Sequence, residues 1–336
     1  MTVCSVIMSL LLLGVTPERP LPAEACTPSE LTRSAHEAVD AGLAWLAAHQ
    51  AADGSFGGRS HYGPHVAITA LAGLAMLSDG QMPDRGQYAH VIDGCVQFVL
   101  DNCDEDGLIS AEASHGPMYG HGFATLFLAE VYGTIGDERV GPALRRAVRL
   151  IVETQNEEGG WRYHPTPNDA DLSVTVCQVM ALRAARNVGV YVPKTTIARS
   201  IQYIKDSQNS EGGFRYMLNS GGSAFARSAA AVAALQYAGI YRGSEIRRGI
   251  DYVHKFVPGR SDSVGHFFYG HYYAVQAMFL AGGEDWQRWW PAVRDDLTGR
   301  QLDDGSWDGQ AGDEYGTSMA LIVLQLPKRL LPIFQK

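Results

Sequence analysis

The sequence predicts an all-α protein, a closed α/α toroid of about six helix-hairpin repeats with six inner and six outer helices. Three observations support this prediction: a repeated turn motif, an amphipathic segment before each turn and a nearly all-apolar segment after it. The chain has 336 residues, of which 46% are hydrophobic and 19% charged, as in an ordinary globular protein. Its net charge of −9 and its lack of Lys/Arg runs argue against a nucleic-acid partner.

The turn motif recurs at positions 50, 103, 155, 208, 257 and 301, with spacings of 53, 52, 53, 49 and 44 residues. In the four clearest copies a glutamine is followed after four positions by glycine and after six by an aromatic residue. These copies are Gln50 with Phe56, Gln155 with Trp161, Gln208 with Phe214, and Gln301 with Trp307. The copies at Cys103 and Val257 are degenerate. A regular period of this length indicates a repeat architecture.

The segments before each turn have the periodicity of surface helices. In "ALRRAVRLIVETQ", residues 143–155, the apolar positions Leu144, Ala147, Val148 and Ile151 follow the spacing i, i+3, i+4 and i+7. The arginines of this segment fall on the opposite face, which is therefore expected to contact solvent. The glycines of the following turn are expected to end the helix.

The segments after each turn are apolar on all sides and rich in Ala and Gly. Examples are "HVAITALAGLAML" at 65–77 and "RSAAAVAALQYAG" at 227–239. A helix of this composition is buried on every face. Outer and inner helices that alternate six times are expected to close into a ring, because the terminal repeats lack the polar face that caps an open solenoid.

Residues 1–25 are predicted to be a signal peptide, followed by a single toroid domain at 26–336. The run "VCSVIMSLLLLGV" at 3–15 is too short to span a bilayer, and Ala23-Glu24-Ala25 fits a leader cleavage site. The mature chain is then exported, to the periplasm or outside the cell, and is expected to contain no transmembrane helix. Without cleavage the chain stays cytoplasmic, and lipidation of Cys26 is an alternative outcome.

The repeat resembles a known family. Its pattern of aromatic-aliphatic-x-x-x-Gln-x-x-x-Gly-x-aromatic is similar to the QW repeat of squalene-hopene cyclases and to the repeats of protein prenyltransferase β subunits. The nearest matches are "QLDDGSWDG" at 301–309 and "QNEEGGWRY" at 155–163, and the resemblance covers about residues 35–326. It implies that each Gln and its aromatic ring tie one outer helix to the next, around a cavity suited to an isoprenoid or another hydrophobic ligand.

The same resemblance makes Asp169 and Asp171 candidate catalytic residues. Terpene cyclases of this family protonate an alkene with the central Asp of a D-x-D-D-T-A motif, and the matching stretch here is "DADLSV". The first two carboxylates match, whereas Leu172 replaces the third. A competing role for either aspartate is to cap the apolar helix that follows.

Two further segments predict cavity residues. "MYGHGFATLFLAEVYG" at 118–133 and "FYGHYYAVQAMFLAGG" at 268–283 both place Tyr-Gly-His at the start of an inner helix, in repeats expected to lie opposite each other. The residues expected to line the cavity are Tyr119, His121, Tyr269, His271, His65 and Tyr315. Alternatively, each histidine only bonds neighbouring carbonyl groups at a helix start.

Metal binding is not expected. The resemblance to prenyltransferases would supply a zinc site from an Asp-x-Cys at one inner helix and a histidine on the next. His271 lies one residue out of register with that histidine, and the preceding repeat has neither Asp nor Cys at its helix start. The spacing of the cysteines also lacks any zinc-finger pattern.

Three functional hypotheses follow from these patterns. The first is an isoprenoid-handling protein of the cyclase or prenyltransferase type, with an incomplete acid motif and an incomplete zinc site. The second is an exported, non-catalytic toroid that binds a hydrophobic ligand or a protein partner. The third is a carbohydrate-active (α/α)6 barrel, in which paired carboxylates such as Asp313 and Glu314 would cleave a glycosidic bond.

Overall fold

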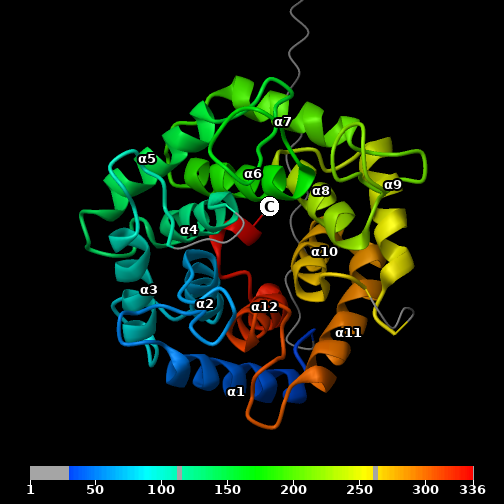
Figure 1. Cartoon of the computed structure of the whole chain (residues 1–336). Helices are drawn as coiled ribbons and strands as arrows, with labels where there is room; N and C mark the ends of the chain where they lie inside the picture. The colour runs from blue at the N-terminus through cyan, green and yellow to red at the C-terminus, as the bar shows by residue number, and fades with distance from the viewer. Residues whose placement is uncertain (1–29, 112–115, 260–263, 336) are drawn as a thin grey trace, which may run out of the picture.

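The computed structural model describes residues 30–111, 116–259 and 264–335, and these form two concentric rings of helices (Figure 1). The outer helices are α1 (Arg33–His49), α3 (Ala89–Asp101), α5 (Val140–Glu153), α7 (Lys194–Asp206), α9 (Ser244–Val253) and α11 (Gly283–Arg300). The inner helices are α2 (Val66–Ser78), α4 (Met118–Val131), α6 (Leu172–Asn187), α8 (Phe225–Tyr237), α10 (Phe267–Ala281) and α12 (Asp313–Gln325). Within the described residues the only extended pairings are isolated bridges in turns.

The rings close on themselves. Each inner helix packs against the next, and α12 completes the circle by packing against α2, while α1 contacts α11. Figure 1 shows the first repeat in blue beside the last repeat in orange and red. The predicted α/α toroid is therefore confirmed.

The burial pattern separates the two kinds of helix as the sequence predicts. Every residue of α2 is buried, because this helix contacts both its inner neighbours and the outer ring. In α5 the apolar stripe that includes Leu144, Ala147, Val148 and Ile151 is buried and faces the inner ring. Burial of each such side chain stabilises the fold by roughly 1.5–3 kcal/mol.

The repeated glutamines connect neighbouring outer helices. The Gln155 side-chain amide donates to the Gly159 carbonyl of its own turn at 2.9 Å and to the Thr196 carbonyl at the start of α7 at 3.0 Å. The other three glutamines make the same pair of bonds, and their contacts with the next outer helix are Gln50 to Val91, Gln208 to Glu245 and Gln301 to Ala38. We call each of these connections between adjacent outer helices a junction.

The aromatic residue of each motif fixes the turn against the inner helix. The Trp161 ring is buried and its indole N–H donates to the Ile151 carbonyl at 2.7 Å. The Trp161 backbone N–H donates to the Thr175 hydroxyl of α6 at 3.0 Å. Hydroxyl groups of the inner helices accept in the same way from the backbone of the other three aromatics, with the pairs Phe56–Thr69, Phe214–Ser228 and Trp307–Thr317.

The glycine of the motif is required by geometry at its turn. Gly159 has φ +95°, and a Cβ atom there would lie 2.5 Å from the backbone oxygen of Arg199 in α7. A side chain would therefore be strained by the backbone conformation and would also push α7 away from the turn.

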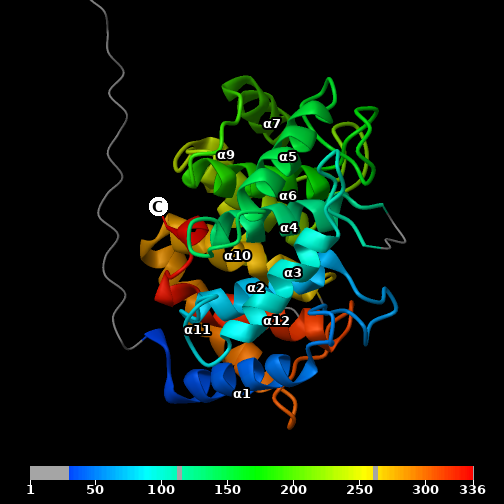
Figure 2. The same ribbon diagram turned by 90° about the vertical axis from the view of Figure 1, so that its left-hand side faces the viewer.

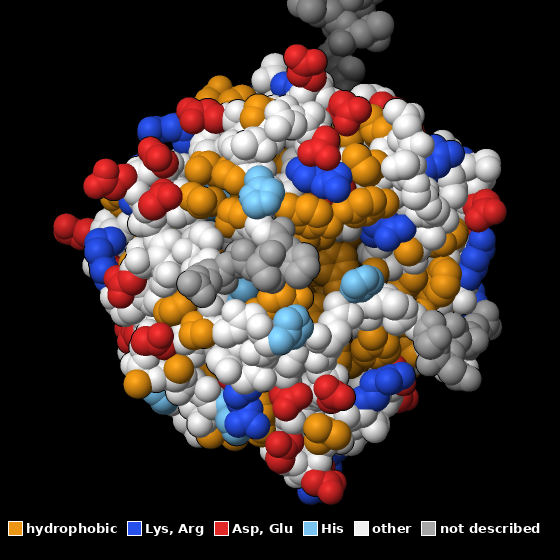
Figure 3. Space-filling model, in the orientation of Figure 1, with side chains coloured by type: hydrophobic (Ala, Val, Ile, Leu, Met, Phe, Trp, Pro, Cys, Tyr) orange, Lys and Arg blue, Asp and Glu red, His pale blue; other side chains and the backbone are white. Residues whose placement is uncertain are grey.

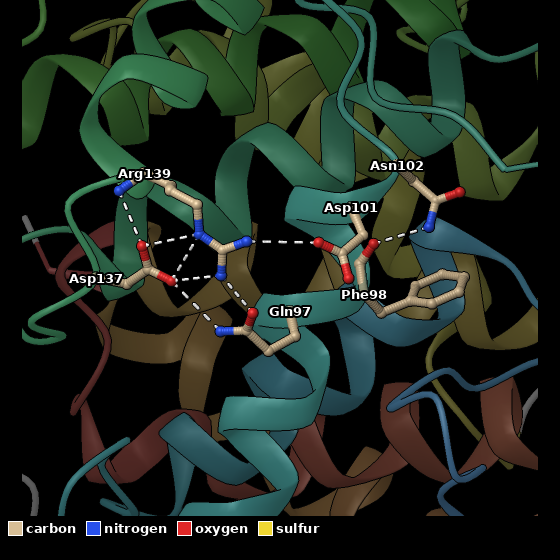
Figure 4. Close-up of polar contacts among 6 residues, drawn as sticks. All are labelled: Gln97, Phe98, Asp101, Asn102, Asp137 and Arg139. Atoms are coloured by element: carbon tan, nitrogen blue, oxygen red, sulfur yellow. Dashed lines mark hydrogen bonds and ion pairs between the residues drawn. The ribbon is translucent and has the colours of Figure 1, made fainter.

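Two of the six junctions lack the glutamine and use charged groups instead. Between α3 and α5, the Arg139 guanidinium pairs with Asp101 at 3.5 Å and with Asp137 at 2.7 Å, and it also contacts Gln97 (Figure 4). Figure 4 also shows the Asn102 amide that bonds the Phe98 carbonyl at the end of α3.

The other such junction lies between α9 and α11. There Asp285 pairs with Arg247 at 3.1 Å and with His254 at 2.8 Å. The two charged junctions lie on opposite sides of the ring (Figure 1).

One end of the barrel is covered by the C-terminal segment. Figure 2 shows this segment at the end opposite the turns that lead into the inner helices. Leu331, Ile333 and Phe334 are buried, and Phe334 belongs to a short 3-10 helix that contacts α6.

No helix among the described residues combines the length and the apolar character that crossing a bilayer requires. The predicted leader at 1–25 lies outside the described residues.

Candidate functional site

A cavity of about 770 Å³ opens at the other end of the barrel, between the first turns of the inner helices. Figure 3 shows it as a hollow lined by hydrophobic side chains, with histidines at its edge. Its apolar body is formed by Ile68, Leu71, Phe123, Phe225 and Met319, and its remaining side-chain lining is largely Tyr, Ser and His. The volume and the apolar surface are those of a small-molecule site.

Seven tyrosines line this cavity, and the hydroxyl groups of Tyr163, Tyr216 and Tyr269 form hydrogen bonds within the protein. The hydroxyls of Tyr163 and Tyr216 share a hydrogen bond of 2.6 Å, and the Tyr269 hydroxyl donates to the Ser173 carbonyl at 3.4 Å. Burial raises the pKa of Tyr119 and of Tyr269 well above its ordinary value, so both remain neutral phenols. The full set is Tyr62, Tyr119, Tyr163, Tyr216, Tyr252, Tyr269 and, on α12, Tyr315.

Tyr119, Tyr269, His65 and Tyr315 lie where the sequence placed them, on the cavity wall. His65 also caps α2, because its Nδ1 accepts from the Ala67 backbone N–H at 3.1 Å. Burial lowers the pKa of His65, which favours a neutral ring whose proton is on Nε2.

Asp171 caps α6 from a fully buried position beside the cavity. Its Oδ1 accepts from the backbone N–H groups of Ser173 at 2.9 Å and Val174 at 3.0 Å. Its Oδ2 accepts no hydrogen bond and lies 3.7 Å from the Arg162 guanidinium. Burial raises the pKa of Asp171 to about 6, against the opposing effects of the cap bonds and Arg162. Asp171 is thus both a helix cap and an acid whose second oxygen is unbonded.

Asp169 occupies a different environment. Its side chain is 53% exposed and pairs with Arg162 at 3.1 Å. The Arg162 guanidinium therefore joins the two candidate aspartates, and it also lies over the rings of Tyr163 and Tyr216 at 5.2 and 5.6 Å. Asp169 is thus an exposed partner of Arg162, whereas Asp171 is buried.

His121 and His271 lie outside the cavity lining, contrary to the expectation from the sequence. His121 accepts from the Ile109 backbone N–H at 3.1 Å and contacts the Ala147 carbonyl at 3.2 Å. The His121 ring thus takes the place of the Thr or Ser hydroxyl that accepts from the turn backbone in the other repeats. Each residue turns a helix by 100°, so a histidine two positions after a cavity tyrosine points about 200° away, toward the outer ring. Burial lowers the pKa of His121 to about 4.

His271 is buried in an aromatic cluster between α10 and α11. Its ring centroid lies 4.4 Å from that of Phe267, 5.0 Å from Phe225 and 5.7 Å from Trp289. Burial lowers the pKa of His271 to about 3, so the ring is neutral. Among the described residues, no group of three or more His, Cys, Asp or Glu could hold a metal ion.

Several lining residues were not predicted from the sequence. Tyr163 and Tyr216 follow the motif aromatics by two positions, in the copies "GWRY" and "GFRY", so the repeat contained a signal for them. Arg227, in the first turn of α8, had no such signal because its segment resembles any other small-residue helix.

Comparisons with known proteins agree with this fold. Residues 124–263 match the family model of the squalene-hopene cyclase C-terminal domain, and residues 21–117 match that of the prenyltransferase alpha-alpha toroid domain. A drimenyl diphosphate synthase of Streptomyces showdoensis is 29% identical over 152 residues, which make up 45% of this chain. These matched residues span only 26% of that relative's length.

Solved structures show the same fold at low sequence identity. The type II terpene cyclase MstE from Scytonema is 15% identical with a TM-score of 0.61, covering 89% of this chain and 99% of that chain. A cellobiose 2-epimerase from Spirochaeta thermophila is 14% identical with a TM-score of 0.66, covering 88% and 95%. An inactive variant of an α-1,6-mannanase from Salegentibacter sp. is 9% identical, also with a TM-score of 0.66, covering 88% and 99%. In its two partial family matches and its closed ring of repeats, this chain is similar to the superfamily of α/α toroids that contains terpene cyclases and prenyltransferases.

Proposed function

We propose that the protein binds an isoprenoid chain in the central cavity and that Asp171 is the acid that acts on it. The observation that carries the proposal is an aromatic, apolar cavity beside a buried carboxyl group with a raised pKa and an unbonded oxygen. Variants of MstE, which shares this fold, have been solved in complex with the substrate geranylgeranyl dihydroxybenzoate and with the product merosterolic acid A.

The proposed reaction is a cyclisation started by a proton. The Asp171 carboxyl group would give its proton to one carbon of a terminal alkene, leaving a cation on the other carbon. A neighbouring double bond would then attack that cation and form a ring, and loss of a proton from the last cation would complete an isomerisation with no net change in atoms. Tyr119, Phe123 and Tyr269 line the cavity, and an aromatic ring whose face is turned to a cation within about 6 Å would stabilise it.

Leu172 takes the place of the third carboxylate of the cyclase motif, and this substitution affects the acid. A carboxylate there would add a negative charge beside Asp171, whereas the buried leucine only excludes water. Asp171 would then owe its raised pKa mainly to burial, with a smaller contribution from the charge of Asp169. Ser173 lines the cavity whereas Asp171 does not, so the acid lies behind the wall, close enough to Tyr119 and Tyr269 for its charge to affect both phenols.

The same geometry disfavours a carbohydrate-cleaving role. Glycoside hydrolysis uses two carboxyl groups that flank the scissile bond. Among the described residues that line this cavity none is Asp or Glu, and Asp171 behind its wall is a single carboxyl group rather than a pair. Glu314 is buried and accepts from the backbone N–H of Gly57 at 2.8 Å, so it serves as a turn acceptor.

The test is incubation of the wild type and of Asp171→Asn with geranylgeraniol, geranylgeranyl diphosphate and squalene. Binding is followed by tryptophan fluorescence, and products are followed by mass spectrometry after gas chromatography. We expect isomeric products from the wild type, and bound substrate without product from Asp171→Asn. Binding without product in the wild type would instead favour the non-catalytic toroid, and absence of binding would refute the isoprenoid role.

Export through residues 1–25 is part of the proposal. It rests on the apolar run at 3–15 and on the Ala23-Glu24-Ala25 site. The intact mass of the secreted chain would then begin at or near Cys26, whereas secreted material that keeps Met1 would contradict cleavage.

A further inference from the structure

The residue that follows the motif aromatic differs among the four clearest copies of the turn. It is glycine in the first repeat, aspartate in the sixth, and arginine in the third and fourth, where the sequence reads "GWRY" and "GFRY". The turn therefore forms without an arginine at this position. Of the two arginines, Arg162 lies in the repeat that carries Asp169 and Asp171, and it pairs with both. These contacts thus belong to the third repeat and not to the architecture that all repeats share.

The Arg162 guanidinium is held in place by its neighbours. It lies 5.2 Å from the ring centroid of Tyr163 and 5.6 Å from that of Tyr216. The hydrogen bond of 2.6 Å between the two tyrosine hydroxyls links these rings. Asp169 pairs with one terminal nitrogen at 3.1 Å, and the arginine side chain is 25% exposed. The position of this cation is therefore fixed by three groups other than Asp171.

The Nε atom of Arg162 lies 3.7 Å from Asp171 Oδ2, the oxygen that accepts no hydrogen bond. The other oxygen accepts from the two backbone N–H groups that cap α6, so Oδ2 carries the proton of the neutral acid. A protonated Oδ2 and the guanidinium are both donors, so a hydrogen bond between them forms only after the proton has left. The arrangement favours the ionised acid over the protonated one.

Transfer of the proton to an alkene would leave a carboxylate in a fully buried position. An isolated charge there has a large desolvation cost, which a cation within about 4 Å reduces. Among the described residues, Arg162 is the only cation that acts on Asp171, and Asp169 is the only other charged group that does. The remaining titratable neighbours are phenols whose pKa is raised by burial, so that they stay neutral: Tyr119, Tyr203, Tyr216 and Tyr269.

We propose that Arg162 is a positioning residue of the proposed reaction, which stabilises the carboxylate that Asp171 becomes when its proton passes to the alkene. The proton leaves Oδ2, the electron pair of the O–H bond stays on that oxygen, and the guanidinium closes to hydrogen-bond distance. The contact loosens again when Asp171 takes up a proton from water. This inference rests on the proposed role of Asp171 as the acid, and it adds a residue from outside the D-x-D-D-T-A pattern.

The experiment measures the protonation of Asp171 in the whole chain by carboxyl ¹³C NMR, with Asp171→Asn to assign the signal. It compares the wild type, Arg162→Gln, Arg162→Lys and Asp169→Asn between about pH 4 and 9. The rate of isomer formation from geranylgeraniol is followed over the same range. Arg215→Gln is the matched control, because Arg215 has the same place in the fourth repeat and joins none of the ion pairs in the described part of the chain.

We expect Arg162→Gln to raise the pKa of Asp171 by about one unit or more, since a neighbouring guanidinium lowers a carboxyl pKa. Arg162→Lys keeps the charge and should restore most of the wild-type value, and Arg215→Gln should match the wild type. Asp169→Asn should lower the pKa of Asp171, because it removes a negative charge and releases Arg162. This opposite shift leaves Arg162 in place, so it tests the same link should Arg162→Gln fail to fold.

In the rate profile, Arg162→Gln should lower the rate at low pH, where Asp171 is protonated, by up to about tenfold per unit of pKa. Its midpoint should also move to higher pH, whereas a merely structural role would lower the rate and leave the midpoint unchanged. Product from the wild type together with an unmoved Asp171 pKa in Arg162→Gln would overturn the role of Arg162 alone. Absence of product from the wild type would overturn Asp171 as the acid, and this role with it.

Discussion

Replacement of Gln155 by alanine tests the role of the repeated glutamine in stability. The Gln155 amide is buried and donates two hydrogen bonds, to the carbonyls of Gly159 and Thr196. The first bond closes the turn after α5, and the second holds α7 against it. Gln155→Ala removes both bonds without adding a group that could replace them.

The expected loss follows from the two acceptors. Each net hydrogen bond contributes about 1 kcal/mol. The Thr196 carbonyl keeps its place in the helical hydrogen-bond ladder, whereas the Gly159 carbonyl is left without a side-chain donor, which adds about 1–2 kcal/mol of desolvation cost. We therefore expect Gln155→Ala to lower the free energy of unfolding by about 2–4 kcal/mol.

Urea denaturation followed by far-UV circular dichroism measures this loss. Gln202→Ala is the control, because Gln202 is an exposed glutamine on α7 whose amide donates only to Asp206. Its loss should stay within about 0.5 kcal/mol. If Gln155→Ala costs no more than this control, the glutamine junctions do not stabilise the ring and the reasoning is refuted.

Three further outcomes are expected. Gly159→Ala should cost at least about 2 kcal/mol, because φ is +95° and the new Cβ would lie 2.5 Å from the Arg199 oxygen; an unchanged melting temperature would contradict this. Burial raises the pKa of Glu130 from 4.5 to about 8 and outweighs a bond from the Ile333 backbone, so the native state holds this proton more tightly than the unfolded chain. The free energy of unfolding of the wild type should therefore fall relative to that of Glu130→Gln, by a few kcal/mol at most, as pH rises from about 5 to 8. If the two free energies change in parallel with pH, the pKa of Glu130 is not raised. Burial likewise raises the folded pKa of Asp171 to about 6, above its ordinary 3.8. Wild-type stability should therefore fall relative to Asp171→Asn by up to about 3 kcal/mol between about pH 4 and 6, since the asparagine amide still caps α6. A difference in urea midpoints that stays constant over this pH range would contradict the raised pKa.

The repeat made the fold predictable because its determinants are local. Gln155, Gly159 and Trp161 lie within seven residues of one another, and each makes its contact at the same turn in every complete copy. The apolar segments after each turn could only be buried helices. The order of inner and outer helices followed from these two features alone.

The site was harder to predict because a pattern of residue types does not determine which face of a helix meets the cavity. Tyr119 and His121 are two residues apart, yet one lines the cavity and the other bonds the outer ring. Asp171 could be placed at a helix start from the sequence, but its unbonded oxygen depends on how α6 packs. Arg227 was not found because its segment resembles any other small-residue helix, and only the three-dimensional structure places it on the cavity wall.

Two of the six junctions depend on exposed ion pairs, Arg139 with Asp101 and Arg247 with Asp285, which salt screens. The other four contain an amide-to-carbonyl bond between uncharged groups, which salt barely affects, and one of them also contains an ion pair. High ionic strength is therefore expected to weaken the contact of α3 with α5 and that of α9 with α11 most, on opposite sides of the ring. The inner ring, in which each helix packs against the next, would then hold the two sides of the toroid together.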